Sequence, residues 1–308
     1  MSFTTHVKNE ISQEISNQTA NQAELSAILR NSYNKNNNTL DLVTENSTVC
    51  KHIYTLFKEL YNINIKTEYK KTKFSKNRLY TLIIPEKENI IFQDLALLDQ
   101  NNNYLDIPES YITECEDEKR AYLKGVFLRT GSINDPKTSM YHLEFFIDYL
   151  EEAEFISNLL NEFYLNSKII NRDKGYMVYI KEAEKISDFL RVIKAFSAVM
   201  YFEDIRIYRD HKNMTNRLNN CEQANMDKVF MTANKQINDI EKLYELDMVD
   251  LLDEKLKTVI EYRMKYKESS LKELAEIMSF ETGTEITKSG LNHRFRKIRE
   301  ILDNIENK

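Results

Sequence analysis

The side chains best suited to chemistry lie in one stretch near the C-terminal end of the sequence. Basic residues gather between positions 288 and 299 with no acid among them, and short polar residues lie near the start: Lys288, Arg294, Arg296, Lys297, Arg299, Ser289, Asn292 and His293. Lysine and arginine bind phosphates, and short polar side chains can reach base edges in the major groove of DNA. The stretch therefore predicts a DNA-reading helix, with a solvated basic face on an ordinary helical hairpin as the alternative.

Two helix signals would position this stretch. Ser270 and Glu273 have the spacing of a capping box, and the apolar stripe after them predicts a first helix that ends near Ser279. Gly283 permits a positive φ in the connection, and Thr287 can cap a second helix. The expected buried stripe of that second helix is Leu291, Phe295, Ile298 and Leu302. The pair predicts a helix-turn-helix, in which the first turns of the second helix enter the major groove.

Composition bounds the remaining possibilities. The 308 residues carry a net charge of -6, with 42% hydrophobic and 11% aromatic residues, which suits two or three domains with real cores. No apolar run reaches about 18 residues and the start is not basic and apolar, so we expect neither a membrane span nor a signal peptide. Cys50, Cys115 and Cys221 lie far apart without a C-x-x-C motif, so we expect no disulfide framework, no structural zinc site and a cytoplasmic location.

The order of predicted elements occurs twice. Helix, strand, helix, strand, strand and helix are expected at residues 23–32, 39–44, 47–60, 63–70, 78–84 and 90–98, and again at 117–130, 141–147, 151–163, 168–172, 176–181 and 182–195, with a further strand beside 131–134. Leu42 matches Leu143 and Tyr80 matches Tyr176, at an offset of about one hundred residues. The pattern predicts an internal duplication, with repeats at about 20–100 and 117–200.

The duplication defines the expected domains. Two such halves, each with a sheet, would form one pseudo-twofold α+β domain over residues 1–210. Residues 211–247 are polar and free of Gly and Pro, so we expect a helical linker there. Residues 248–308 would form an all-α helix-turn-helix domain.

Each predicted repeat begins with a helix that resembles the LAGLIDADG signature of homing endonucleases. Residues 123–131 read LKGVFLRTG, and residues 25–33 give a weaker match with Ala27 in the place of Gly125. In that family the two helices pack through small residues, and a carboxylate near the end of each holds divalent metal for phosphodiester hydrolysis. Ser32 and Thr130 take those positions here, so we expect a lost nuclease site, no metal and no cofactor. A plain core helix is the alternative for either segment alone.

A second basic cluster lies in the first repeat. Lys70, Lys71 and Lys73 crowd its pair of strands, with only Glu68 against them. Such lysines would neutralise a DNA backbone and add affinity with little sequence information. A solubilising edge of lysines is the alternative, because exposed strands often carry one.

A degenerate LAGLIDADG pair followed by a helix-turn-helix resembles the WhiA family of bacterial regulators. The residues that carry the resemblance are 216–217 (NR), 219–222 (NNCE), 224–228 (ANMDK), 270–274 (SLKEL) and 288–294 (KSGLNHR). The resemblance implies a DNA-binding transcription regulator of cell division and chromosome segregation, linked to sporulation in some relatives. In the linker motif, Arg217 and Asn220 are candidate contacts to the phosphate backbone, with helix capping and packing at a domain junction as the alternative.

The expected partner is double-stranded DNA, bound by a nucleoid-associated protein that is not an enzyme. Other transcription or division proteins are further candidate partners. The sequence leaves the oligomeric state open, and a monomer fits it. Two functions from other classes stay open: an active homing endonuclease, against which the missing carboxylates argue, and a protein-binding scaffold for division or segregation.

Overall fold

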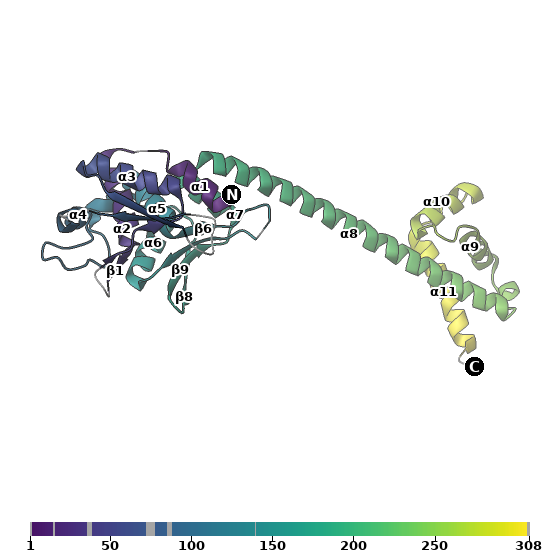
Figure 1. Cartoon of the computed structure of the whole chain (residues 1–308). Helices are drawn as coiled ribbons and strands as arrows, with labels where there is room; N and C mark the ends of the chain where they lie inside the picture. Colours follow the sequence, from purple (N-terminus) through teal and green to yellow (C-terminus); the bar gives the residue numbers. More distant parts are fainter. Residues whose placement is uncertain are drawn as a thin grey trace. The chain divides into compact units, whose positions relative to one another are not determined.

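The computed structural model describes residues 2–14, 16–35, 39–71, 78–84, 88–138 and 140–306. The chain divides into two compact units, Met1–Arg209 and Asp210–Lys308. The first unit combines helices with sheets, and the second is helical (Figure 1).

The first unit contains two halves in sequence. An opening helix and the first half comprise α1 (Phe3–Ile11), α2 (Gln18–Arg30), β1 (Tyr33–Asn34), β2 (Thr39–Leu40), β3 (Val43–Thr44), α3 (Ser47–Tyr61), β4 (Lys66–Lys71), β5 (Arg78–Ile83) and α4 (Glu88–Asp94). After the short 3-10 helix η1 (Ser110–Thr113), the second half comprises α5 (Glu116–Thr130), β6 (Gly131–Ile133), β7 (Leu143–Ile147), α6 (Leu150–Glu162), β8 (Lys168–Arg172), β9 (Gly175–Ile180) and α7 (Ala183–Val192).

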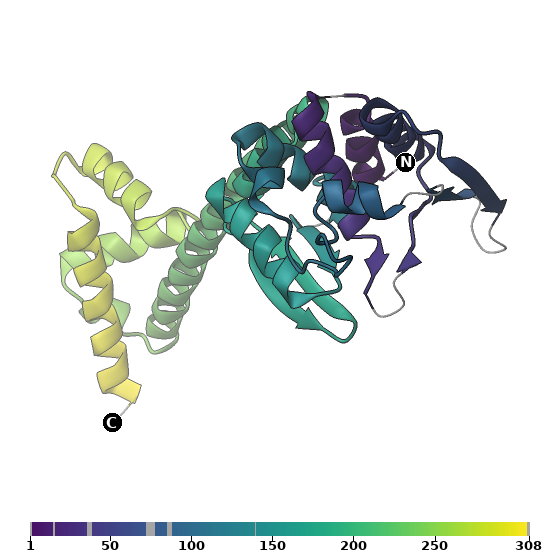
Figure 2. The same cartoon turned by 90° about the vertical axis from the view of Figure 1, so that its left-hand side faces the viewer.

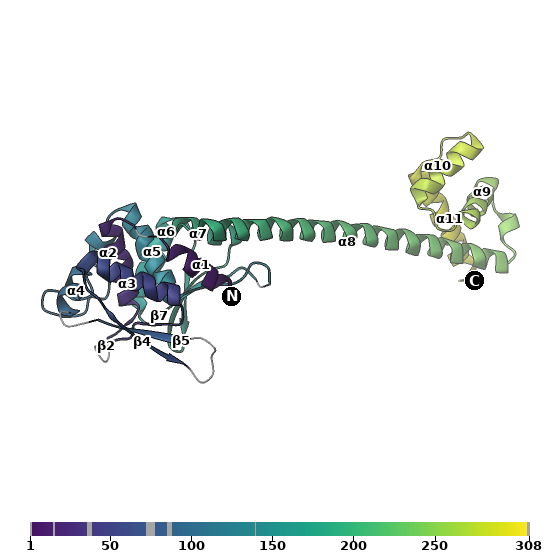
Figure 3. The same cartoon turned by 45° about the horizontal axis from the view of Figure 1, so that its top comes forward.

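The two halves build their sheets in the same order. The first sheet runs β3-β5-β4 and the second β6-β7-β9-β8, so β3, β5 and β4 correspond to β7, β9 and β8. All these strands pair antiparallel. Figure 3 labels the β4–β5 hairpin of the first half, and Figure 2 shows the β8–β9 hairpin of the second half in teal. The predicted pseudo-twofold α+β duplication is confirmed.

Helices α2 and α5 form the centre of the first unit. Gly125 brings the two backbones together, because a Cβ built on it would lie 2.4 Å from the Glu24 carbonyl oxygen and 2.9 Å from the Ala27 Cβ. Both helices are buried over most of their length, and one apolar core continues from them to the sheets and the outer helices. The small residues at matching positions therefore serve close packing, as the sequence indicated.

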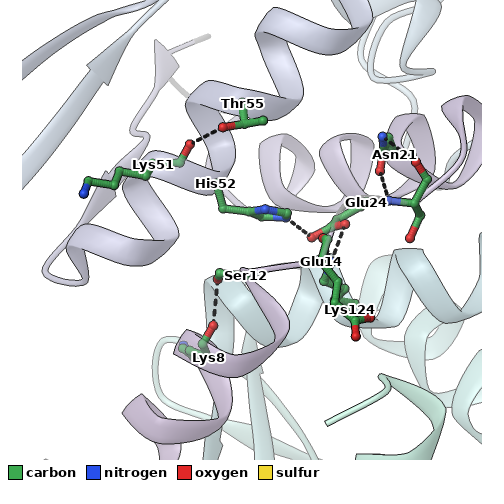
Figure 4. A network of polar contacts seen from close by, with 10 residues as sticks. Lys8, Ser12, Glu14, Asn21, Glu24, Lys51, His52, Thr55 and Lys124 are labelled. Atoms are coloured by element: carbon green, nitrogen blue, oxygen red, sulfur yellow. Dashed lines mark hydrogen bonds and ion pairs between the residues drawn. The ribbon is translucent and has the colours of Figure 1, made fainter.

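A buried charged cluster links three helices of the first unit (Figure 4). Glu24 on α2 lies 2.7 Å from His52 Nε2 on α3 through Oε1, and 3.0 Å from Lys124 Nζ on α5 through Oε2. The Lys124 ammonium also donates to the Glu14 carbonyl oxygen at 3.0 Å. Glu24, His52 and Lys124 are 0%, 3% and 6% exposed. The cluster therefore replaces hydration with mutual contacts, as a buried charge requires.

The second unit takes the C-terminal part of α8 (Phe196–Glu245) and adds η2 (Val249–Leu251), α9 (Glu254–Lys265), α10 (Leu271–Thr282) and α11 (Lys288–Glu306). Its core joins Ile240 and Leu243 of α8 to apolar residues of the other helices: Leu256, Val259, Ile260, Leu274, Ala275, Met278, Leu291, Phe295, Ile298 and Leu302. The predicted stripe of α11 is thus buried. Figures 1 and 3 show α9, α10 and α11 beside this end of α8.

Three local predictions are wrong. The strand expected at 39–44 is two short strands, β2 and β3, which belong to different sheets. The first helix of the hairpin continues past Ser279 to Thr282. The helix predicted to end at Ala195 ends at Val192. The stretch expected to be a helical linker, 211–247, is helical up to Glu245, as part of the 50-residue helix α8 that begins at Phe196.

Among the helices that the structure describes, none combines the length and apolar character needed to cross a membrane.

Candidate nucleic-acid interface

The α10–α11 hairpin is fixed by hydrogen bonds at both ends of its turn. Ser270 Oγ accepts from the Glu273 amide, and the Glu273 carboxylate accepts from the Ser270 amide, which completes the predicted capping box. At the far end Gly283 has φ 64°, a left-handed value that glycine adopts readily. The Ser279 hydroxyl then bridges the turn, accepting from the Ile286 amide at 2.9 Å.

Helix α11 begins on a second cap. The Thr287 hydroxyl accepts from the Gly290 amide at 3.1 Å, as the sequence predicted. Two helices joined by a short fixed turn, the second capped and amphipathic, have the arrangement of a helix-turn-helix. In such an arrangement the first turns of the second helix contact DNA, so the start of α11 is the candidate DNA-reading surface of the second unit.

Exposure and pairing divide the predicted residues of α11 into two groups. Ser289, Asn292, His293 and Arg296 are exposed and recur at i, i+3, i+4 and i+7, so they share one helix face. Lys288 is also exposed, one residue before that face begins. Glu300, one turn beyond Arg296, is the first acid to follow on the same side.

The second group consists of cations that are half-buried or lie beside a carboxylate. Arg299 is half-buried and lies 3.8 Å from an Asp239 carboxylate oxygen on α8 and 3.9 Å from one of Asp303. Lys297 is exposed but lies 3.3 Å from the carboxylate of Asp253, the residue that caps α9. Arg294 is half-buried. Asp253 lies 44 positions before Lys297 in the sequence, and Asp239 lies still farther from Arg299. Local sequence patterns therefore did not reveal these two contacts.

A hollow of about 290 Å³ beside the start of α10 adds cations that the sequence interpretation missed. Lys228 of α8, Lys272 of α10 and Lys288 of α11 line it, together with Arg263. Within the described part of the chain, no acidic residue lines this hollow, although Lys272 lies 3.9 Å from Glu276. Its charge and its place at the N-terminus of α10 suit a phosphate group.

The linker-motif candidates lie on an exposed part of α8. Arg217 and Asn220 are both exposed, as are all residues from 210 to 228. The alternative for Arg217 and Asn220 was packing at a domain junction, and neither side chain is buried within the second unit. A role for them in contacting phosphates stays a prediction.

In the described part of the basic strand pair of the first unit, an acid lies among the lysines on one face of β4. Glu68 pairs with Thr81 and Lys70 with Leu79 across the β4–β5 ladder, so Lys66, Glu68 and Lys70 alternate with Thr67 and Tyr69 along β4. Lys66 lies 2.7 Å from Glu68, which offsets its charge locally. Lys70 is exposed and Lys71 ends β4, while Lys73 lies outside the described residues.

The ends of α2 and α5, where the homing-endonuclease carboxylates would lie, are occupied by hydroxyls and a guanidinium. Ser32 Oγ donates to the Ile28 carbonyl oxygen and accepts from Arg129 Nε at 2.7 Å. Arg129 also donates to the carbonyl oxygens of Val43 and Asp41, and Thr130 Oγ1 donates to that of Val126. A fixed cation, Arg129, thus lies beside Ser32, one of the two positions at which the catalytic carboxylate is predicted to be missing. The sequence interpretation did not single out Arg129.

Two acids, Asp148 and Glu152, line a hollow together with Arg129 and Thr130, and Glu152 is buried and hard to ionise. Burial raises the pKa of the Glu152 carboxyl from its ordinary 4.5 to about 7, against the opposing charges of Arg30 and Lys35. Asn31 Nδ2 donates to Glu152 Oε1 at 2.9 Å, and the side chain is 2% exposed. Within the described ranges, no group of three or more His, Cys, Asp and Glu residues is arranged to hold a metal ion.

Glu152 should make the stability of the first unit pH-dependent. Its folded pKa is raised, so the stability it contributes is present below about pH 4.5 and lost as the pH rises through about 7. We expect the free energy of unfolding to fall by about 3 kcal/mol over that window relative to a Glu152→Gln variant. Urea unfolding of both proteins at several pH values measures the difference. Parallel pH profiles would contradict it.

The fold and the hairpin define a class of protein: two LAGLIDADG-like repeats followed by a helix-turn-helix domain. Domain models match in that order: the WhiA N-terminal LAGLIDADG-like domain over residues 18–98, the WhiA LAGLIDADG-like domain over 119–212 and the WhiA C-terminal HTH domain over 215–302. The chain belongs to the WhiA family.

Individual relatives agree over the whole length. The chain is 41% identical over 310 residues to the probable cell division protein WhiA of Bacillus cytotoxicus, covering 99% of this chain and 97% of the relative. It is 40% identical over 313 residues to the protein of the same name from Brevibacillus brevis, covering 100% and 98%. The crystal structure of full-length DUF199/WhiA from Thermatoga maritima matches with a TM-score of 0.56 over 99% of both chains at 20% identity, which shows a shared fold.

Proposed function

We propose that this protein is a DNA-binding transcription regulator that reads duplex DNA with the start of α11 and leaves both strands intact. The observation that carries the proposal is the exposed, acid-free face of Ser289, Asn292, His293 and Arg296 on the second helix of a capped helix-turn-helix. On this basis Asn292 and His293 contact base edges, and Arg296 contacts guanine or phosphate.

Phosphate contacts would flank that face. Lys228, Lys272 and Lys288 line one hollow and supply charge at the start of α10 and α11. Counterion release makes such contacts add affinity at low salt without selecting a sequence. Lys297 and Arg299 contribute less on this proposal, because each lies near a carboxylate of the same unit.

The decisive experiment compares two arginines of the same helix. Immunoprecipitation followed by sequencing supplies bound duplexes, and fluorescence anisotropy then measures their affinity for the full chain. We expect Arg296→Ala to weaken binding by roughly tenfold and to lower the salt slope by about 1 if Arg296 neutralises a phosphate. The matched control, Arg299→Ala, removes an arginine three residues later that lies beside Asp239, and should leave affinity nearly unchanged. Equal losses for the two variants would count against the proposed reading face.

The proposal of no nuclease activity rests on the ends of α2 and α5. The side chains there are hydroxyls hydrogen-bonded to carbonyl oxygens and an arginine whose guanidinium donates to neutral acceptors. Neutral hydroxyls beside a fixed cation are poor ligands for a hard divalent metal ion, which prefers carboxylates. Incubation with magnesium and a bound duplex, followed by a gel, tests this point. Clean double-strand cuts would overturn it.

Two relatives that cover nearly the whole chain are named probable cell division proteins. We extend a role in cell division to this protein as part of the proposal, together with a nucleoid-associated location and a contribution to chromosome segregation and, in sporulating hosts, to sporulation. Depletion of the protein followed by microscopy of division septa and nucleoids tests the extension.

A protein-binding scaffold is the second candidate function, and one observation favours it. The exposed stretch of α8 carries apolar side chains, with Met214 63%, Leu218 55% and Met226 66% exposed. Large exposed apolar residues on a helix suit a protein partner. A pull-down whose partners persist after nuclease treatment, from a variant that no longer binds DNA, would favour this function.

A further inference from the structure

The first unit contains a cavity of about 350 Å³ to which the proposed DNA-binding function gives no role. Residues from α1, α3, β3, β5 and the ends of α2 and α5 line it. Its volume falls in the range of pockets for small molecules. It opens to the surface of the first unit, but its volume is too small for a DNA duplex, so an occupant would be small.

One part of the cavity wall is aliphatic. Side chains from α2, α3, β5, α5 and the connection between β2 and β3 form it: Ile28, Leu42, Val49, Ile53, Leu82 and Leu128. Within the described part of the chain, no aromatic side chain lines the cavity. A nucleobase or another planar ring would find no stacking partner there, whereas an alkyl chain would bury its surface against these residues.

Another part of the wall carries positive charge. Lys8 and Arg129 both line the cavity, and burial together with the Arg129 charge lowers the pKa of the Lys8 ammonium to about 8. Among the described residues, Lys8 forms no ion pair, and its nearest aromatic contact is the Phe127 ring at 5.6 Å. In the described part of the chain, the hydrogen bonds of Arg129 go to neutral oxygens, those of Ser32, Val43 and Asp41.

In the described structure neither of these two half-buried cations forms an ion pair, although the carboxylates of Asp148 and Asp41 act on the Arg129 charge from farther away. The other charged residue that lines the cavity in the described structure is Glu45, whose side chain is exposed and lies between β3 and α3. Buried charge is stabilised when an opposite charge reaches it, and charge-assisted hydrogen bonds to carboxylates are among the stronger ones. Threonine hydroxyls from Thr4 and Thr5, which also line the cavity, are available as further donors.

We propose that this cavity binds a small aliphatic carboxylate. Its carboxylate would accept hydrogen bonds from the Lys8 ammonium and lie beside the Arg129 guanidinium, and its alkyl chain would pack against Ile28, Leu42 and Leu82. The ligand is thus a short or medium-chain fatty acid by chemical class. This site is independent of α11, so the failure of either proposal leaves the other intact.

Isothermal titration calorimetry of the full-length protein with octanoate tests the site. We expect one octanoate per chain, bound at least about tenfold more tightly than 1-octanol, which lacks the charge, or acetate, which lacks the chain. Equal affinity for octanoate and 1-octanol would overturn the charged end of the site. Equal affinity for octanoate and acetate would overturn the aliphatic end, and several weak sites per chain would overturn the cavity altogether.

Variants then locate the ligand. Lys8→Met keeps an apolar stem and removes the ammonium, so octanoate affinity should fall by about tenfold or more while 1-octanol binding is unchanged. Because the substitution removes a desolvated charge, the variant should fold, and its Tm without ligand checks this. Lys51→Met, at an exposed lysine of α3 outside the cavity, is the matched control and should bind octanoate like the unmodified protein. An unchanged affinity in Lys8→Met would reject the proposal.

A readout in the unmodified protein checks the same contact. A bound carboxylate favours the protonated form of Lys8, so binding at pH 8 should take up about half a proton per octanoate. Titrations in two buffers of different ionisation enthalpy measure that number. Zero uptake at pH 8, together with tight binding, would place the ligand away from Lys8 and overturn the proposed orientation.

Discussion

Replacement of Glu24 by leucine is expected to destabilise the first unit by about 3–5 kcal/mol, because it leaves two buried groups without their carboxylate. Lys124 Nζ lies 3.0 Å and His52 Nε2 2.7 Å from the Glu24 oxygens, and all three residues are buried. After the substitution, the ammonium would keep only the Glu14 carbonyl oxygen. Urea unfolding followed by circular dichroism measures the loss.

The double variant separates the cost of an unpaired charge from the value of the pair. Exchanging a buried ion pair for apolar side chains of similar volume is often neutral or stabilising, whereas removing one partner is not. We therefore expect Glu24→Leu with Lys124→Met to recover most of the stability lost in either single variant. Additive losses in the double variant would show that Glu24 and Lys124 contribute to stability independently, and would contradict the explanation by an orphaned partner. Glu24→Gln, which keeps the shape, should fall between the extremes.

The duplication was predictable from the sequence because its evidence is local and repeated. Apolar spacing marks each helix, and Gly125 and Ala27 occupy matching places in two segments about one hundred residues apart. The matching orders of the two sheets follow from that repetition, since strands corresponding in sequence occupy corresponding places. The capping box at Ser270 was equally predictable, because its two partners lie three residues apart in the sequence.

The local errors arise where distant groups decide the backbone. Residues 41 and 42 leave the expected strand between β2 and β3, where the Asp41 amide donates to the Ser32 carbonyl oxygen and Arg129 donates to the Asp41 carbonyl. At Ser279, a polar residue that suggested a helix end instead bonds across the turn to Ile286. Neither partner is visible from local propensity. The real end of α10 was marked by Gly283, which the sequence had placed in the connection.

The candidate interface was predictable in kind and less so in detail. A basic stretch on an amphipathic helix can be read from spacing alone, but which of its cations are engaged depends on residues elsewhere in the fold. Arg299 lies beside Asp239 and Lys297 beside Asp253, and both aspartates come from other helices. The hollow that groups Lys228, Lys272 and Lys288 likewise depends on three helices packing together. Contacts formed in the folded unit therefore leave fewer of the basic side chains of α11 available to bind a DNA duplex.

Replacement of Gly125 by leucine is expected to prevent the first unit from folding, because the side chain would enter the contact between α2 and α5. A Cβ alone would lie 2.4 Å from the Glu24 carbonyl oxygen, and backbone cannot move aside as the end of a flexible side chain can. Even Gly125→Ala should destabilise by about 1–3 kcal/mol through overpacking, although alanine is intrinsically better in a helix by roughly 1 kcal/mol. Differential scanning calorimetry of the full chain measures both.

Gly290→Ala in α11 is the matched control, since it makes the same change at another helical glycine. A Cβ there would meet only the Thr287 hydroxyl at 3.3 Å and no backbone within 4 Å, so the gain in helix propensity should appear as a neutral or slightly raised Tm of the second unit. The two glycines differ in their surroundings rather than in their intrinsic preference. A Gly125→Ala variant that stabilised the first unit would contradict this prediction, because the central helices would then not depend on close backbone approach. The packing of the two LAGLIDADG-like helices would instead have to depend on the buried Glu24 cluster.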